Sequence, residues 1–572
     1  MPCSHHKGEQ QPNIIDLSQL EYSKSKCPVE EGICRLCQDI SGVEKDIADA
    51  IARVKDLLSR HQQLKAEINS THSPIIRDLP VDVLSKIFYA CFSDDVQNDH
   101  WKTQRKDVVV PLKIAGICRT WRQVAWSTPE LWTVIVISRR FSSCGFSRSS
   151  ALSPSWACDQ YDMIREWVTR SGILPLHVSI YENLGDDDNI DVNKYVSARQ
   201  RAGCSCWEST LKVLGECSYR WKDVCMNMSR YSFEVIASSV ELKPPSRSLS
   251  LSHDCGLETW PYRWPDALQL WKEPGFGPQR VITDAPVRFG HFSIGWQHVS
   301  HVDVEGWSIV DCLDLLKITP RLLSCAFADV RESQPGLGEP VTCHESLREL
   351  SLYCKNSPGE FFDHVALPSL DNFTYPDRYS RDSPVKVDDP SLMSFFTRSS
   401  FPLTKLSVVA HMFTPGYMVT ILNTVPLLTH LNVYCSGDSA TMTRIVMTFF
   451  LDHLASTSAT STIAEGGSRD RFSQAGSFLP RLEALELLGS WEFNFLWSSV
   501  ANIFGSPSEV GAEGQRPLRS LGLHTWTPNP VKGLSDEMVA RFLSLKEAGI
   551  AINYILRSYS HETVPVSWEG AQ

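Results

Sequence analysis

The sequence predicts a protein of mixed α + α/β class, with an N-terminal helix, a small all-α unit and an irregular solenoid built from repeats. Three patterns support this prediction. Apolar residues recur every seven positions near the N-terminus, two amphipathic helices follow, and an apolar triad returns many times along the rest of the chain. At 572 residues the chain is too long for one hydrophobic core, so we expect several structured units.

The N-terminal region divides into a polar tail and a long helix. Residues 1–38 are polar, mixed in charge and without periodicity, which predicts a disordered tail. Residues 39–72 predict a coiled-coil-like helix with two interleaved seven-residue series: Ile40, Ile47, Val54, His61 and Ile68, and Val43, Ala50, Leu57 and Leu64. This stripe fits either a single helix folded back on the next domain or the seam of a parallel homodimer, and the sequence leaves both open.

Residues 73–135 predict a small helical unit. The long helix must end before Ser73-Pro74, because the residue before a proline is disfavoured in the α region. Pro80 suits the first turn of a helix, whose apolar positions are Val83, Leu84, Ile87, Phe88 and Cys91. A second helix over 111–125 has its apolar positions at Ile114, Ile117, Cys118 and Trp121, and residues 128–132 close the unit.

This unit resembles the F-box in the order and spacing of its residues. The matching positions are Leu79, Pro80, Asp82, Leu84, Ile87, Phe88, Cys118, Arg119, Trp121, Pro129, Leu131 and Trp132. Two features depart from the family's pattern: Asp82 stands where glutamate is commoner, and the polar segment Ser93–Asp107 is inserted between the helices. A surface loop would accommodate this insertion at modest entropic cost.

The resemblance implies partners as well as a fold. F-box proteins bind a Skp-type adaptor and through it a cullin, and the large fungal sets of F-box proteins have a similar architecture. On this resemblance, the adaptor-binding residues are Leu79, Pro80, Leu84, Ile87, Phe88, Ile114, Cys118 and Trp121.

Residues 160–560 contain apolar triads of the form L-x-x-L-x-L, which are typical of leucine-rich repeats. The clearest copies begin at Leu347, Leu403, Leu428, Leu482 and Leu518, and weaker ones at Ile173, Trp221, Val299, Leu322 and Leu370. Residues 455–477 are rich in Ser, Thr, Gly and Ala, which predicts a flexible loop within this domain. Near the end, residues 536–548 suit a last helix and residues 550–556 a closing strand.

The repeats also predict a binding surface. In a stack of such repeats the apolar residues of each strand point inward, while the residues between them lie on one continuous outer face. We expect the target protein to bind there, through Arg348, Ser351, Lys405, Ser407, His430, Asn432, Glu483 and Glu486. For any single residue, a solvated strand face is the simpler interpretation.

Composition and motifs exclude several other classes. The formal net charge of −11 argues against a general nucleic-acid binder. No apolar run is long enough to cross a bilayer and the N-terminus lacks the apolar core of a signal peptide, so we expect no membrane association and a cytoplasmic or nuclear location. The 18 cysteines are scattered, and Cys27, Cys34 and Cys37 lack a second ligand pair, so we expect neither a metal site nor a cofactor.

Enzyme motifs are also absent. The sequence has no Walker-type lysine motif, no H-E-x-x-H and no G-x-S-x-G, and we expect no catalytic residue. Cys343-His344-Glu345 places a thiol beside an imidazole, but catalytic pairs meet through the fold and not by adjacency in sequence.

Two function classes remain. The first is a non-catalytic substrate receptor of a Skp–cullin–F-box ubiquitin ligase, which holds an unidentified target protein for ubiquitination. The alternative is an F-box scaffold that takes part in protein–protein interaction without a cullin. Either could form a homodimer through the coiled-coil segment.

Overall fold

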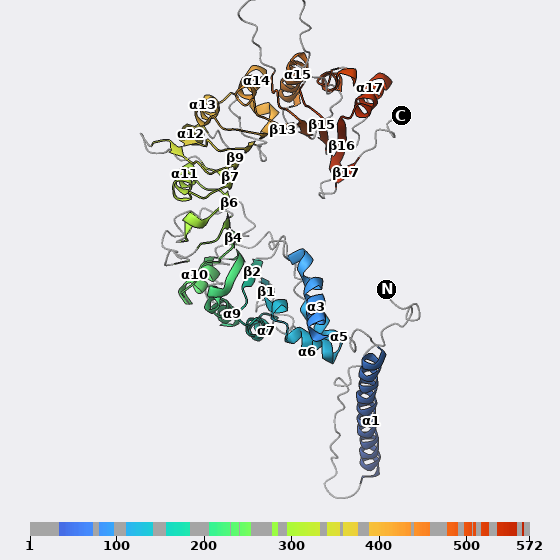
Figure 1. Ribbon diagram of the computed structural model, residues 1–572. Coiled ribbons are helices and arrows are strands. Elements are labelled where there is room, and N and C mark those ends of the chain that lie inside the picture. The colour runs from blue at the N-terminus through green and yellow to red at the C-terminus, as the bar shows by residue number, and fades with distance from the viewer. Residues whose placement is uncertain are drawn as a thin grey trace, which may run out of the picture. The chain divides into compact units, whose positions relative to one another are not determined.

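The computed structural model describes residues 34–72, 79–96, 110–140, 156–183, 205–228, 230–239, 241–252, 271, 277–283, 294–331, 340–354, 359–375, 388–435, 440–457, 478–489, 497–505, 507–510, 516–525, 535–557 and 563–565 (Figure 1). The chain divides into two compact units. Unit 1 comprises residues 1–97 and 109–131, and unit 2 comprises residues 98–108 and 132–572. Most of the predicted tail over 1–38 and of the predicted loop over 455–477 lies outside the described residues.

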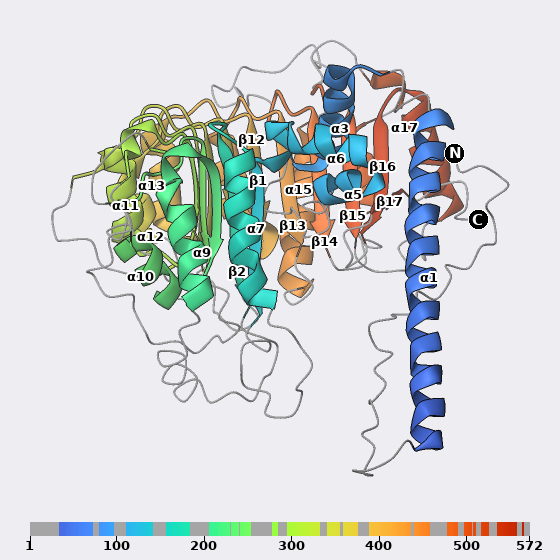
Figure 2. The ribbon, with the colours of Figure 1, turned by 90° about the horizontal axis from the view of Figure 1, so that it is seen from below.

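Unit 1 is helical in its described residues. It contains α1 (Arg35–His72), α3 (Val81–Val96), α5 (Val110–Ile117), α6 (Arg119–Trp126) and the start of the 3-10 turn η4 (Pro129–Trp132). Figure 2 shows α1 as one unbroken helix, and it covers the predicted heptad segment. Helix α3 continues through Val96, so the start of the predicted insertion over 93–107 is helical and its remainder lies outside the described residues.

The second predicted helix of this unit is broken in two. Cys118 has extended backbone angles, φ −155° and ψ 172°, and its Sγ accepts a hydrogen bond from the Trp121 amide at 3.4 Å. The cysteine is therefore the N-cap of α6 and not an interior helical residue. The Arg122 side chain donates to the Ala115 carbonyl at 3.0 Å, which satisfies an acceptor near the C-terminus of α5.

Unit 2 is dominated by one sheet of 15 strands, whose order in the sheet follows their order in the chain. Strands β8 and β10 are not part of this sheet. All neighbouring strands are parallel except β16 and β17. The strands are β1 (Val134–Arg140), β2 (Leu176–Asn183), β3 (Trp221–Asn227), β4 (Ser248–Ser252), β5 (Arg280–Thr283), β6 (His301–Glu305), β7 (Ser324–Val330), β9 (Glu349–Cys354), β11 (Asn372–Tyr375), β12 (Lys405–Val409), β13 (His430–Cys435), β14 (Ala484–Gly489), β15 (Ser520–Thr525), β16 (Ala551–Arg557) and β17 (Thr563–Pro565). A separate pair joins β8 (Thr342–Cys343) to β10 (Val365–Ala366).

Helices connect many of the parallel strands and lie along one side of the sheet (Figure 1). They are α7 (Trp156–Arg170), α9 (Ser205–Glu216), α10 (Arg230–Ser239), α11 (Ile309–Ile318), α12 (Gly359–Asp363), α13 (Pro390–Ser399), α14 (Pro415–Asn423), α15 (Ala440–Ser456), α16 (Trp497–Asn502) and α17 (Asp536–Glu547). Short 3-10 turns supplement them: η6 (Ser218–Arg220), η8 (Trp296–His298), η9 (Ala410–Met412) and η11 (Pro507–Glu509).

The predicted fold class, α + α/β with a small all-α F-box followed by an irregular leucine-rich-repeat solenoid, is wrong. The structure has an α/β-type fold with one continuous parallel sheet, which begins at Val134 and not at residue 160. The apolar triads mark buried strand positions, but they do not determine how many strands join or what connects them. Parallel neighbours need crossover connections, and this chain supplies many of them as helices on one face.

Two rows of buried side chains run across the sheet from β1 to β16. The first row, set by strand register, is Ile135, Val178, Val224, Leu249, Val281, Val302, Cys325, Leu350, Phe373, Leu406, Leu431, Leu485, Leu521 and Ile552. The middle residue of every predicted triad lies in this row except for the triad that begins at Ile173, whose last residue, Val178, lies there instead. Because side chains alternate along a strand, the row two residues further on is also buried over most of its length, and it faces the same helices.

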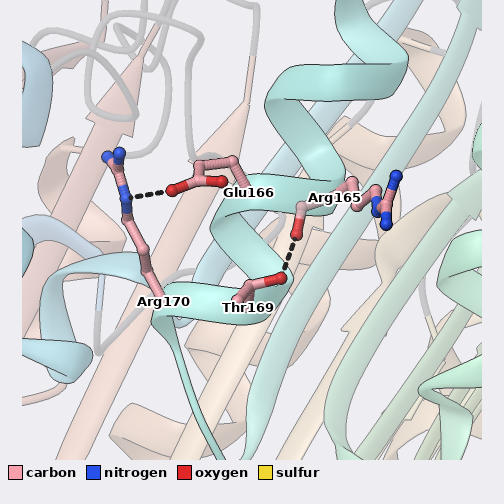
Figure 3. A network of polar contacts seen from close by, with 4 residues as sticks. All are labelled: Arg165, Glu166, Thr169 and Arg170. Atoms are coloured by element: carbon pink, nitrogen blue, oxygen red, sulfur yellow. Dashed lines mark hydrogen bonds and ion pairs between the residues drawn. The ribbon is translucent and has the colours of Figure 1, made fainter.

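Aromatic contacts join the turn η4, which directly precedes β1, to helix α7. The buried Trp132 ring lies 5.3 Å from the Trp167 ring, edge to face, and the Arg170 guanidinium lies 4.7 Å from the centroid of the Trp132 ring. Figure 3 shows Arg170 on α7, where Glu166 accepts its hydrogen bond at 2.9 Å. The cation therefore interacts with a π face and a carboxylate at once, which fixes the end of α7.

Three arginines satisfy carbonyls near helix C-termini in unit 2. Arg220 donates to the Val168 and Leu174 carbonyls, and Arg398 donates to those of Phe362 and Val365. Arg516 makes the largest set: it donates to the carbonyls of Leu454, Phe478 and Leu479 and to the Thr457 hydroxyl. The last carbonyls of a helix lack intrahelical donors, so a guanidinium with five N–H groups suits these positions.

Candidate functional site

Helix α3 divides the predicted adaptor-binding residues into an inner and an outer set. Ile87 is 41% exposed, and Pro80 is also exposed just before the helix begins. Leu79 is half-buried. Val83, one helical turn before Ile87, is 40% exposed, so these two side chains form an apolar stripe on the surface of α3.

The inner set holds the helices of unit 1 together. Leu84, Phe88 and Ile114 are buried, and the Phe88 ring lies 4.9 Å from the ring of the half-buried Trp121. These positions form the hydrophobic core between α3, α5 and α6. The adaptor-binding role of the set stays a prediction. Because these residues are buried, we expect their substitution to affect adaptor binding by destabilising the unit and not by removing a direct contact.

Other exposed apolar residues on the same helices were not among the predicted adaptor-binding residues. Val81 on α3, Leu112 and Ile117 on α5 and Trp126 on α6 are all more than 40% exposed. Helix α3 packs against both α5 and α6. Exposed apolar groups mark protein-binding surfaces where they form a patch, so these three packed helices are the candidate docking site of unit 1. We call Val81, Val83, Ile87, Leu112, Ile117 and Trp126 the apolar surface of unit 1.

In unit 2 the candidate site is the face of the sheet opposite the buried rows. Strand register places one residue from each strand between β2 and β16 in line across it, in a first polar row: His177, Asp223, Ser248, Arg280, His301, Ser324, Glu349, Asn372, Lys405 and His430, continuing to Ala484, Ser520 and Ala551. A second row lies two residues further along each strand. We call these two rows the polar face.

The structure brings six of the predicted target-binding residues onto neighbouring strands of the polar face. Ser351, Ser407, Asn432 and Glu486 lie in the second row, and Lys405 and His430 are adjacent in the first. Thr374 completes the second row between Ser351 and Ser407, and sequence analysis missed it because its triad is weak. Asn432 Nδ2 donates to Ser407 Oγ at 3.2 Å. Ser407 is buried, whereas Lys405 and His430 are exposed.

The other two predicted residues lie at the edge of the sheet. Arg348 and Glu483 each precede a strand by one residue, and both are exposed. Their carbonyls accept hydrogen bonds from the next strand along: Asp371 and Asn372 donate to Arg348, and Arg519 and Ser520 donate to Glu483. Their side chains therefore border the polar face beside the first row.

A buried carboxylate marks the N-terminal part of the polar face. Asp223 is only 4% exposed, and its Oδ2 lies 2.8 Å from His177 Nδ1, while Oδ1 accepts a hydrogen bond from the Ser248 hydroxyl. Arg247 approaches the same Oδ2 at 3.9 Å. In a Ser-His-Asp hydrolase the histidine lies between serine and aspartate, whereas here the aspartate lies between the other two. The arrangement is a polar cluster with a hydrogen bond and an ion pair at the same carboxylate, and only the strand register reveals it.

At the C-terminal part, a glycine makes room for a second polar group. A Cβ at Gly522 would lie 3.1 Å from both Glu486 Cγ and His524 Nε2, a distance tighter than ordinary packing. His524 Nε2 lies 4.0 Å from Glu486 Oε2, and the glutamate side chain is 44% exposed. Gly522 therefore allows the imidazole and the exposed carboxylate to lie side by side.

The thiol and imidazole of Cys343-His344 do not form a catalytic pair. The His344 ring is buried, its Nε2 lies 2.8 Å from the Thr319 carbonyl, and its Nδ1 accepts a hydrogen bond from the Leu347 amide at 3.1 Å. Both ring nitrogens are thus engaged by the backbone.

Burial raises the pKa of the Cys217 thiol to about 11, and burial together with Asp303 raises the pKa of Cys325 well above its usual range. Such thiols stay protonated and unreactive at neutral pH.

Within the part of the chain that the structure describes, no group of three or more His, Cys, Asp or Glu residues is placed to hold a metal ion. None of the helices in the described ranges combines the length and the apolar character that crossing a bilayer requires.

The two candidate sites are therefore an apolar surface on short helices and a polar face on a parallel sheet. Comparison with known proteins adds no family to this description: no protein-family model matches the chain, and no curated protein matches it.

Proposed function

We propose that the chain is a non-catalytic substrate receptor of a Skp–cullin–F-box ubiquitin ligase. One observation carries the proposal: the residues that resemble the F-box coincide with helices whose large apolar side chains remain on the surface, Val83 and Ile87 foremost. A protein that docks on an adaptor needs such a surface, because a few anchor side chains that become buried on binding supply most of the binding free energy. The polar face then holds the target protein.

The mechanism is one of local concentration. A target held by the receptor is tethered near a ubiquitin-conjugating enzyme, so attack by its lysine no longer depends on a chance encounter. The polar face supports this role because its exposed groups differ in charge from strand to strand, with Glu349, Lys405, His430 and Glu486 among them. Mixed charges and amides recognise a folded protein better than a phosphate backbone.

The first test concerns the apolar surface. Val83→Asp with Ile87→Asp should lower the affinity for a purified Skp-type adaptor by at least about 100-fold, since two exposed anchors are replaced by charges. The matched control is Ile445→Asp with Phe449→Asp, an equally spaced exposed pair on α15 in unit 2. The control should bind the adaptor as wild type does. Full binding by the α3 variant would contradict the docking assignment.

The second test separates the two surfaces in the full chain. Lys405→Glu with His430→Glu should reduce target capture at least about tenfold and leave adaptor binding unchanged, while the α3 variant should show the reverse pattern. Quantitative affinity purification of both variants beside wild type measures this. Targets that follow the α3 surface and ignore the polar face would contradict the proposal. Co-purification of the adaptor without a cullin would favour the scaffold alternative.

A further inference from the structure

Helix α1 presents an uncovered apolar seam. Ile40, Val43, Ile47, Val54, Leu57, Leu64 and Ile68 occupy the alternating heptad positions, and each is between 40% and 58% exposed. Seven large aliphatic groups on one stripe of a 38-residue helix are costly to leave in water, at about 25 cal/mol per Å² of apolar surface. The seam therefore needs an occupant, and its sequence decides which.

We propose that the occupant is α1 of a second copy of this chain, and that the two helices run antiparallel. Aligning the two heptad series over residues 39–72 of both copies pairs residues whose numbers sum to 111, so the seam layers are Val43 with Ile68, Ile47 with Leu64, Ala50 with His61, and Val54 with Leu57. Each layer occurs twice in the dimer, because either copy can supply either of its two residues.

The seam volumes favour this direction. In a parallel pair every layer is a residue against its own copy, so Ala50 would face Ala50 and leave a void, while His61 would face His61. The antiparallel pair places the large imidazole of His61 against the small Ala50. Complementary volumes in each layer pack to higher density than one void and one crowded polar layer.

The residues that flank the seam point the same way. In the antiparallel pair Glu44 lies opposite the second copy's Lys65, and Ile51 lies opposite the second copy's Leu58, which widens the apolar seam. In a parallel pair Asp39 would lie opposite Glu44 and Arg60 opposite Lys65, both of like charge, while Ile51 and Leu58 would face charged groups.

The other antiparallel flank carries like charges, since Asp46 lies opposite Glu67 and Arg53 opposite Arg60. These like-charge pairs weaken the antiparallel dimer. They do not favour the parallel dimer, because it has the same number of repulsive pairs and no attractive pair.

The arrangement has a geometric consequence. A helix of 38 residues is about 57 Å long. The two chains therefore leave the dimer at opposite ends of this rod, and a parallel pair would release them at the same end.

Charge exchange in the full chain tests the direction. In the antiparallel dimer Glu44→Lys alone and Lys65→Glu alone should each weaken dimerisation about tenfold, and the double variant should return it to within about threefold of wild type. The parallel dimer gives the opposite sign for both single variants: the new lysine would face Asp39 and the new glutamate would face Arg60, so each would strengthen the dimer.

The measurement is sedimentation equilibrium over a concentration series, with a chain mass of 64.4 kDa, and circular dichroism of each variant to verify that helicity is kept. Ile47→Asp serves as a second variant, because it places a charge in the seam and should give a monomer in either direction. A wild-type chain that stays monomeric at all concentrations, as expected if α1 folds back on its own chain, would overturn the proposal. So would tighter dimers in both single variants.

Discussion

Arg516→Leu should destabilise unit 2 by about 2–4 kcal/mol, because one substitution removes donors from several buried carbonyls. The guanidinium donates to the carbonyl of Leu454 at the end of α15. It also donates to the carbonyls of Phe478 and Leu479, at the start of the next described segment. It therefore ties together two segments that are distant in sequence. Burial lowers the pKa of Arg516 to about 10, which still leaves it a cation at neutral pH.

The readout is hydrogen exchange of peptides that cover residues 440–457 and 478–489, together with urea unfolding of the full chain. Arg516→Lys should be intermediate, because a single ammonium cannot reach both segments with the planar fork of a guanidinium. Arg519→Leu is the matched control, since its side chain is exposed. Equal protection in Arg516→Leu and Arg519→Leu would show that the guanidinium contacts contribute nothing.

Phe88→Ala should destabilise unit 1 by about 3–5 kcal/mol, whereas Ile87→Ala on the same helix should cost less than about 1 kcal/mol. The Phe88 ring is buried against Trp121, while 41% of Ile87 is exposed. A binding defect caused by Phe88→Ala is therefore a folding effect, and one caused by Ile87→Ala is a contact effect.

Local exchange measurements distinguish these cases. Peptides from α3, α5 and α6 should lose protection in Phe88→Ala and keep it in Ile87→Ala, while peptides from the sheet stay unchanged in both. Loss of protection of similar size in the two variants would mean that the division of α3 into an inner and an outer face is incorrect. The same criterion applies to Leu84, which is as deeply buried as Phe88.

Local periodicity alone determined much of the secondary structure. The heptads predicted a helix that the structure gives as α1, and the triads predicted buried strand positions, most of whose middle residues form one row across the sheet. The last helix and closing strand are likewise confirmed as α17 and β16. These features depend on contacts between residues near in sequence, or on alternation within one strand, so a single segment carries the signal.

Three features of the protein are determined only by its tertiary structure. Leu84 and Ile87 belong to one apolar stripe in the sequence, and only the packing of α5 and α6 buries the first and leaves the second exposed. The break at Cys118 depends on how the two helices pack. Finally, hydrogen bonding between strands aligns His177, Asp223 and Ser248, which come from three separate segments of the chain. Register between distant strands is a property of the assembled sheet, and no segment encodes it alone.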